Sequence, residues 1–264
     1  MTSSRFALLL AIILLGQDDS RAEEAIARSS EDALPNVTAR TGEFNVSFTI
    51  GELLGPAATR YETIIPVDEP LAWQMYVPES YSHQRPAGIM VYISPKQTAK
   101  IPRQWKPLMA EHNLIWIGAN DSGNRVPVPR RMAFALTAPA VVDRDYETDA
   151  GRVYLTGFSG GGRVASMVAA EFPSLFRGAI FNCGAVFWRT ETPDGLDQIR
   201  NNRYVFVTGT YDQALEPTKK AFRAYREAGV DNSKLMIIRN MAHRNPKWRD
   251  FDKAIRFLDM KSLE

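Results

Sequence analysis

The chain has 264 residues, of which 45% are hydrophobic and 23% charged, a composition with enough apolar material for one sizeable core. The formal net charge is +2, from 32 basic and 30 acidic side chains, so no strong field favours nucleic acid or an anionic membrane as a partner. The sequence has no glycine-rich phosphate loop and no clustered Cys/His spacing, so we predict neither an organic cofactor nor a metal. The single cysteine, Cys183, excludes an internal disulfide, and its apolar neighbours predict a buried, inert thiol.

Residues 6–16 form the apolar run FALLLAIILLG. Its length suits the hydrophobic region of a secretory signal peptide, whereas a bilayer span needs about 20 residues. The small residues Ser20 and Ala22 predict a cleavage site before Glu23, although acidic residues nearby leave the cut position open. We therefore predict a signal peptide over 1–22 and a secreted or periplasmic protein with no stable membrane span. An uncleaved membrane anchor is the alternative.

The rest of the chain predicts one domain, in which strands alternate with helices. Residues 23–57 are interpreted as a linker with an irregular or β arm, and 61–66 and 72–78 as two antiparallel strands. Continuous apolar runs predict strands buried on both faces at 88–94, 114–119, 152–157, 178–184, 203–209 and 234–239. Helical patterns occur at 130–146, 161–176, 216–229 and 248–260. This alternation predicts an α/β fold over 58–264, with a mostly parallel central sheet and helices on both faces.

The pattern G-x-S-x-G occurs at 157–161, as GFSGG. A predicted strand lies directly upstream and an amphipathic helix directly downstream, which is the context that a nucleophile elbow requires. Glycines beside Ser159 would let neighbouring backbone approach closely, and the helix N-terminus would present free N–H groups to an oxyanion. We therefore predict that Ser159 is a nucleophile.

A serine nucleophile needs a base, and the sequence offers three histidines. His243 follows the last predicted strand, at the sheet edge where catalytic groups gather in α/β folds, and is predicted to be the base. His83 lies in a polar turn and is interpreted as a surface residue. His112 ends a short helix and is interpreted as a C-terminal cap or a surface group.

An acid between serine and histidine in the chain should orient the histidine. Asp212 leaves the strand at 203–209 and is the predicted acid. Glu216 is the nearest rival, but Pro217 beside it indicates a residue that caps a helix. Asp194 and Asp197 lie in a polar stretch and are interpreted as solvated.

The oxyanion hole is predicted to use the backbone N–H of Gly160, which follows the nucleophile. A second N–H should come from the loop SPKQ after the strand at 88–94, where Pro95 has none, so Ser94, Lys96 and Gln97 stay open, with Ser94 the residue we select. After the next strand, a polar loop could line the pocket or be an ordinary turn. Its candidate residues are Asn120, Ser122 and Asn124.

Over residues 58–262 the sequence resembles the α/β-hydrolase fold, and more closely the exported carboxylesterases of the polyhydroxybutyrate-depolymerase and feruloyl-esterase type. The motifs that carry this resemblance are RVYLTGFSGGGRVASMVA, VTGTYD and NMAHRNP. It implies Ser159 as nucleophile, Asp212 as acid, His243 as base and Gly160 in the oxyanion hole. Two features depart from the family: a single cysteine excludes its frequent disulfides, and the loop at Ser94 is not glycine-rich.

The predicted function is an exported serine hydrolase that cleaves small-molecule or polymeric carboxylic esters through an acyl-enzyme, without a cofactor. A peptidase or acyltransferase would use the same triad, and a catalytically silent binding protein could keep the same fold, so both alternatives stay open. Four aromatic residues would suit an aromatic or sugar-linked substrate, although core packing explains them as well. These residues are Trp105, Trp116, Phe187 and Trp188.

Overall fold

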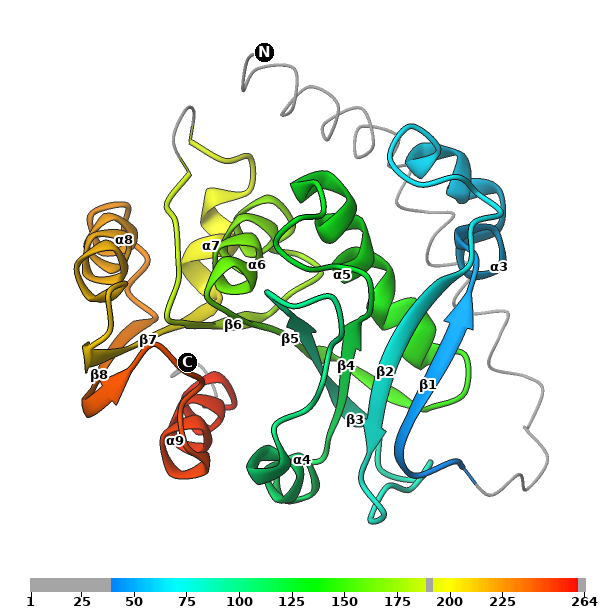
Figure 1. Ribbon diagram of the computed structural model, residues 1–264, viewed down its shortest axis with the longest axis horizontal. Helices are drawn as coiled ribbons and strands as arrows, with labels where there is room; N and C mark the ends of the chain where they lie inside the picture. The colour runs from blue at the N-terminus through cyan, green and yellow to red at the C-terminus, as the bar shows by residue number, and fades with distance from the viewer. Residues whose placement is uncertain (1–38, 189–191, 261–264) are drawn as a thin grey trace.

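The structure is a computed structural model that describes residues 39–188 and 192–260 of the chain (Figure 1). The predicted signal peptide at 1–22 lies outside the described residues. Within them, one eight-stranded sheet has the strand order β1-β2-β4-β3-β5-β6-β7-β8. Its strands are β1 (Gly42–Phe48), β2 (Leu71–Val77), β3 (Ala87–Ile93), β4 (Leu114–Ala119), β5 (Thr148–Phe158), β6 (Gly178–Asn182), β7 (Arg203–Tyr211) and β8 (Ser233–Ala242).

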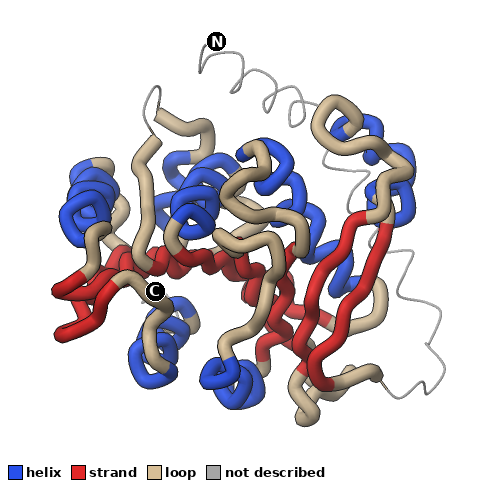
Figure 2. The backbone as a smooth tube through the Cα atoms, in the orientation of Figure 1, coloured by secondary structure: helices blue, strands red, loops and turns tan. Residues whose placement is uncertain are grey.

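Helices cover both faces of this sheet (Figure 2). The strands from β4 to β8 pair in parallel, and β2 joins β1 and β4 antiparallel. The helices are α3 (Ile50–Leu54), η2 (Gly55–Tyr61), η3 (Arg103–Trp105), α4 (Lys106–Glu111), α5 (Val128–Asp143), α6 (Gly160–Glu171), α7 (Leu196–Asn201), α8 (Leu215–Glu227) and α9 (Trp248–Leu258). The predicted α/β class, with a mostly parallel sheet between helices, is therefore confirmed.

Two apolar cores lie on opposite faces of the sheet, and alternate residues of β3 enter each of them. Ile89 and Val91 pack in the core beneath α5, α6 and α8, while Met90 and Tyr92 pack in the core beneath α4 and α9. Successive side chains of a strand point to opposite faces, so a strand buried on both faces must be apolar throughout. No helix among the described residues has the length and apolar character that a bilayer span requires.

The antiparallel partner of β2 is not the strand predicted at 61–66. That segment follows η2 as a turn, where the N–H of Ile65 donates to the carbonyl of Tyr61, and Ile65 packs inward with no exposed surface. On its outer side, β2 pairs instead with β1, which lies within the arm predicted over 23–57. Its sequence GEFNVSF alternates polar and apolar residues, the period of an edge strand, whereas the two isoleucines at 64–65 only anchor a turn.

The helix α7 is also absent from the sequence prediction, which placed Asp194 and Asp197 in the polar stretch 190–198 and interpreted them as solvated. Gly195 precedes this helix in the left-handed region, with φ 79°, and Ile199 is its buried residue. A single buried side chain in six residues gives no helical period, so the tertiary packing of Ile199 places this helix.

Candidate active site

Ser159 lies on a sharp turn between the last residue of β5 and the first residue of α6. Its backbone has φ 55° and ψ −119°, a conformation that costs a non-glycine residue about 1–3 kcal/mol. The turn is held from the neighbouring strand, because the N–H of Ser159 donates to the carbonyl of Asn182 at 2.8 Å. Gly161 allows the close approach behind the turn, since a Cβ there would lie 1.9 Å from the carbonyl oxygen of Ile93. The expected strand–serine–helix elbow is therefore present as a strained turn.

The structure brings Ser159, His243 and Asp212 into one hydrogen-bonded chain. Nε2 of His243 lies 2.8 Å from Oγ of Ser159, and Nδ1 of His243 lies 2.7 Å from Oδ1 of Asp212. The side chain of Asp212 is completely buried, while that of His243 is 28% exposed. The ring of Phe158 packs 5.0 Å from the imidazole ring and limits its movement. With the proton on Nδ1, the imidazole donates to the carboxylate and presents an acceptor to the serine hydroxyl.

Several groups donate hydrogen bonds to the carboxylate of Asp212. Its Oδ1 accepts from the N–H of Ala214 at 2.9 Å, and its Oδ2 accepts from Oγ1 of Thr208 at 2.9 Å. Burial by itself would raise the pKa of Asp212, but contact with the thiol of Cys183 and hydrogen bonds from Ala214, His243 and Thr208 outweigh it and lower that pKa below its ordinary value. Asp212 is therefore an anion at neutral pH. Sequence analysis missed Thr208 and Cys183 as its partners, although both follow apolar strand residues at the same sheet edge.

Gly160 follows Ser159 and is the first residue of α6. The first hydrogen bond inside this turn of the helix joins the N–H of Arg163 to the carbonyl of Ser159, so the N–H of Gly160 has no partner within the helix. The amide side chain of Asn124 lies directly against Gly160, because a Cβ on that glycine would be 2.2 Å from Oδ1 of Asn124. Among the polar-loop candidates, this asparagine approaches the elbow.

Ser94 follows β3 and lies beside the elbow, where the ideal Cβ of Gly161 would be 3.2 Å from its carbonyl carbon. The N–H of Lys96 donates to Oγ of Ser94 at 3.0 Å, so that N–H is already engaged. Gln97 uses its carbonyl oxygen and its Oε1 to accept from Asp121 and from Gly123. The second N–H of the oxyanion hole therefore stays a prediction. Of the three candidates, Lys96 fits least well because its N–H already has a partner.

Arg131 holds the loops after β3 and β4 together from α5, and sequence analysis did not identify it. Its Nη2 donates to the carbonyl of Ser94 at 2.9 Å and its Nε to the carbonyl of Ser122 at 2.8 Å. The residue is only 3% exposed, and burial lowers the pKa of its guanidinium. An arginine at the start of an otherwise apolar helical pattern is the sequence signal that could have indicated this role. Asn120, the remaining loop candidate, accepts from the N–H of Ala99 and is a turn residue.

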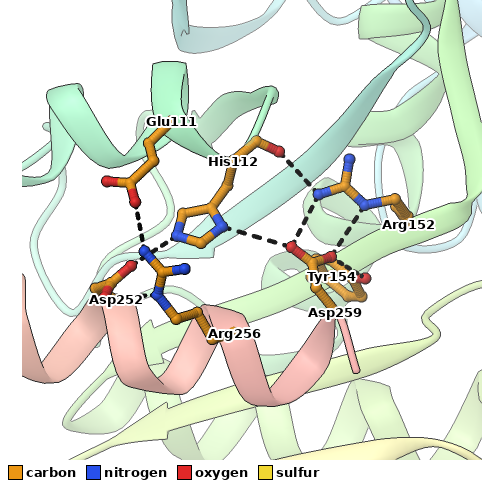
Figure 3. A network of polar contacts seen from close by, with 7 residues as sticks. All are labelled: Glu111, His112, Arg152, Tyr154, Asp252, Arg256 and Asp259. Atoms are coloured by element: carbon orange, nitrogen blue, oxygen red, sulfur yellow. Dashed lines mark hydrogen bonds and ion pairs between the residues drawn. The ribbon is translucent and has the colours of Figure 1, made fainter. Parts of the chain in front are cut away.

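The other two histidines lie away from the elbow. His83 is exposed and contacts the hydroxyl of Tyr81. His112 is the C-cap of α4, as predicted, but its side chain is only 8% exposed and belongs to a network that ties α9 to α4 and β5 (Figure 3). In that network, Nε2 of His112 lies 2.8 Å from Oδ1 of Asp252, and Nδ1 lies 3.6 Å from Oδ2 of Asp259.

The carboxylates that were rivals to Asp212 are exposed. Glu216 pairs with Lys219 at 2.7 Å on the surface of α8, and Asp194 and Asp197 face solvent, as expected. Two of the four aromatic candidates, Trp105 and Trp116, are fully buried, so core packing explains them. Phe187 and Trp188 are half-buried after β6.

No protein-family model matches the sequence, and no curated protein sequence matches it. The structure is similar to a thermostable esterase, with a TM-score of 0.58 at 15% identity over 82% of this chain and 62% of that chain. It is similar to a ferulic acid esterase, with a TM-score of 0.58 at 14% identity over 83% of this chain and 97% of that chain.

A third similar structure is the acylaminoacyl peptidase of Pyrococcus horikoshii, with a TM-score of 0.55 at 15% identity over 72% of this chain and 39% of that chain. The chain thus spans less than two thirds of the length of the thermostable esterase and of the peptidase, but nearly all of the ferulic acid esterase. Identities this low bear on the fold and not on the substrate. By its strand order and by these similarities, the chain has the α/β-hydrolase fold.

Proposed function

We propose that the protein is a serine hydrolase that cleaves carboxylic esters through an acyl-enzyme. The observation that carries this proposal is the unbroken hydrogen-bonded chain from Asp212 through His243 to Oγ of Ser159. The serine stands on a strained turn at the N-terminus of a helix, where N–H groups can receive a developing negative charge.

In the first half of the reaction, Oγ of Ser159 attacks the ester carbonyl carbon while Nε2 of His243 takes the hydroxyl proton. The carbonyl electrons move to the oxygen, and the N–H of Gly160 stabilises this oxyanion together with a donor from the Ser94 loop. The intermediate collapses, the bond to the alcohol oxygen breaks, and Nε2 of His243 returns its proton to that oxygen. Asp212 stays ionised and stabilises the imidazolium while the charge exists.

In the second half, a water molecule takes the place of the alcohol. Nε2 of His243 takes a proton from the water, whose oxygen attacks the acyl carbon, and the same N–H groups receive the second oxyanion. Collapse of this intermediate breaks the bond to Oγ of Ser159, which recovers its proton from His243. The products are a carboxylic acid and an alcohol, and the chain is restored.

Replacing the nucleophile tests the proposal. Ser159→Ala should lower kcat for short p-nitrophenyl esters by about 10⁴-fold or more, with an unchanged circular dichroism spectrum and melting temperature. The control is Ser82→Ala, which removes the hydroxyl of an exposed serine and should keep full turnover. A fluorophosphonate should label the wild-type protein at Ser159 and fail to label Ser159→Ala. Retained turnover by that variant would overturn the assignment, and an unlabelled wild-type protein would favour a silent binding protein.

A peptidase is the second candidate, supported by the similarity to the acylaminoacyl peptidase. Acylation of the serine is the same for an ester and an amide, so turnover of matched ester and anilide substrates decides between the two. An acyltransferase would give transfer to an added alcohol in preference to water.

We also propose that the protein is exported. The support is the apolar run at 6–16 followed by small residues, which is typical of a cleaved signal peptide. N-terminal sequencing of the protein recovered from the periplasm or medium should begin near Glu23. A full-length protein retained inside the cell would contradict this proposal.

A further inference from the structure

A cleft of about 760 Å³ is lined by residues of α6, of α8 and of the segment that follows β6. That volume is in the range of pockets that hold small organic ligands. The helix α8 lines the cleft with Pro217, Lys220 and Ala224, spaced so that they share one face of the helix. None of Ser159, Asp212 and His243 lines it, so the cleft is a neighbouring site rather than the reaction centre.

The residues that line the cleft lie close in the chain, or in space, to the residues of the candidate active site. Arg163 lies one turn after Ser159 on α6, and its N–H donates to the carbonyl of Ser159 at 3.1 Å. Ala185 follows Gly184, where a Cβ would be 2.2 Å from the carbonyl oxygen of Ser159. Pro217 lies in the first turn of α8, shortly after Asp212. The cleft therefore adjoins the elements that carry Ser159 and Asp212.

One wall of the cleft is aromatic and anchored to the core. The rings of Phe187 and Trp188 lie 3.8 Å apart, and Trp188 packs 5.1 Å from the fully buried ring of Tyr225. The backbone of the same segment is fixed to α6, because the N–H of Val186 donates to Oγ of Ser166 at 2.9 Å. This wall offers a preformed apolar surface.

The charges at the cleft have one sign. Arg163 and Lys220 are exposed at its edge, and no carboxylate is among its lining residues. Neither cation has an ion-pair partner within 39–188 or 192–260. The nearest acid on α8, Glu216, is occupied by Lys219. Two unpaired cations beside an apolar wall favour an anion with an apolar body.

We propose that the cleft binds a carboxylate-bearing part of the ester substrate, with Arg163 and Lys220 at the carboxylate and the Phe187–Trp188 wall against its apolar part. This inference rests on the proposed ester hydrolysis at Ser159 and names its substrate class. The carboxylate can belong to the acyl portion or to the alcohol portion of the ester. The test therefore includes one ester with a carboxylate on its acyl portion and one with a carboxylate on its alcohol portion.

Two pairs of esters measure the preference for charge. The acyl-side pair is p-nitrophenyl hydrogen adipate and p-nitrophenyl heptanoate, and the alcohol-side pair is para-butyryloxybenzoate and para-butyryloxybenzamide. In the wild-type protein, kcat/KM should favour the anionic member of at least one pair. About 0.5 M salt should weaken that preference, because exposed charges are screened over a few ångströms at this ionic strength.

The variants are Arg163→Gln, Lys220→Gln and the double variant. Each single change should lower the anionic-to-neutral ratio of kcat/KM by about two- to fivefold, and the double change by about tenfold, through KM. The matched control is Arg223→Gln, which removes an exposed cation of α8 that does not line the cleft, and it should leave the ratio unchanged. An unchanged ratio in the double variant, or an equal loss in the control, would overturn the inference.

A binding measurement separates this inference from the proposed function. In the Ser159→Ala background, para-hydroxybenzoate should change tryptophan fluorescence with a lower Kd than para-hydroxybenzamide, and adding both cleft changes should remove that difference. If the wild-type protein hydrolyses none of the esters, the proposed function fails, while the titration still decides whether the cleft binds a carboxylate. Equal Kd values for the two compounds would overturn the carboxylate site even if the esters are hydrolysed.

Discussion

The thiol of Cys183 lies beside the carboxylate of Asp212 and at the same time donates to the carbonyl of Arg244 at 3.2 Å. One buried side chain thus contacts the acid and the segment that begins at His243. Cys183 reaches this position with φ 53°, a conformation that is costly for a residue with a Cβ. Burial raises the pKa of this thiol, so it acts as a neutral donor and not as a thiolate.

Removing the thiol should weaken the acid. Cys183→Ala should lower the free energy of unfolding by about 1–2 kcal/mol, because a small cavity forms and the carbonyl of Arg244 loses its donor. Contact with Cys183 helps to lower the pKa of Asp212, so in the variant that pKa rises and the acidic limb of the kcat/KM profile should move to higher pH. Cys183→Ser keeps a donor and should remain closer to the wild-type profile. Identical profiles for all three proteins would contradict a role for the thiol.

Two adjacent glycines should respond differently to the same substitution. Gly161→Ala places a Cβ 1.9 Å from the backbone oxygen of Ile93, which cannot move without breaking the sheet, so we expect insoluble protein or a loss of more than about 3 kcal/mol. Gly160→Ala meets only the end of the Asn124 side chain, which can rotate away. That variant should fold normally and lose part of its turnover, because the Asn124 side chain beside the elbow is displaced. Chemical denaturation and ester kinetics measure both effects, and similar stabilities for the two variants would contradict the packing shown here.

Arg131 should be needed for the loops at the reaction centre. Arg131→Met leaves the carbonyls of Ser94 and Ser122 without donors, so the free energy of unfolding should fall by about 2–4 kcal/mol and kcat should fall with it. The neighbouring variant Arg130→Gln removes a half-exposed pair with Glu69 and should cost less than about 1 kcal/mol. Equal losses of stability for the two variants would show that the buried guanidinium of Arg131 has no special role.

The network around His112 should make stability depend on pH. Burial opposes the charged imidazole, but hydrogen bonds to Asp259 and Asp252 outweigh it and raise the pKa of His112. Its stabilisation is therefore fully present below the unfolded pKa of about 6.5 and is lost as pH rises through the folded pKa. His112→Gln should lower the free energy of unfolding by about 2 kcal/mol near pH 5.5 and by clearly less near pH 9.

The exposed His83 supplies the control for this measurement. His83→Gln should change the free energy of unfolding little at either pH, because its exposed ring contacts the hydroxyl and the ring of Tyr81 and pairs with no carboxylate among the described residues. Denaturant unfolding at the two pH values measures both variants. A larger loss at high pH for His112→Gln would contradict the sign derived from the network.

Much of the fold follows from local sequence. The strands from β2 onward and four of the longer helices lie where apolar runs and helical periods predict them. The strand predicted at 234–239 to be buried on both faces is the exception in burial, because β8 is an edge strand in which Ile237 is 43% exposed. The exceptions in position have a common cause. At β1, α7 and the turn at 61–66, the structure depends on what a few apolar residues pack against. Such tertiary contacts leave no periodic pattern in the local sequence, so these elements could not be predicted from it.

By itself, the sequence determined an elbow at Ser159 and selected Asp212 and His243 as candidate partners, because glycine spacing and positions after strands are local properties. Only the tertiary structure decided that Nε2 of His243 reaches Ser159, that Cys183 and Thr208 surround the acid, and that Arg131 joins two loops. It also decided that Arg163 and Lys220 share one cleft without a carboxylate. These contacts join residues far apart in the chain, and the packing of the whole sheet sets their distances.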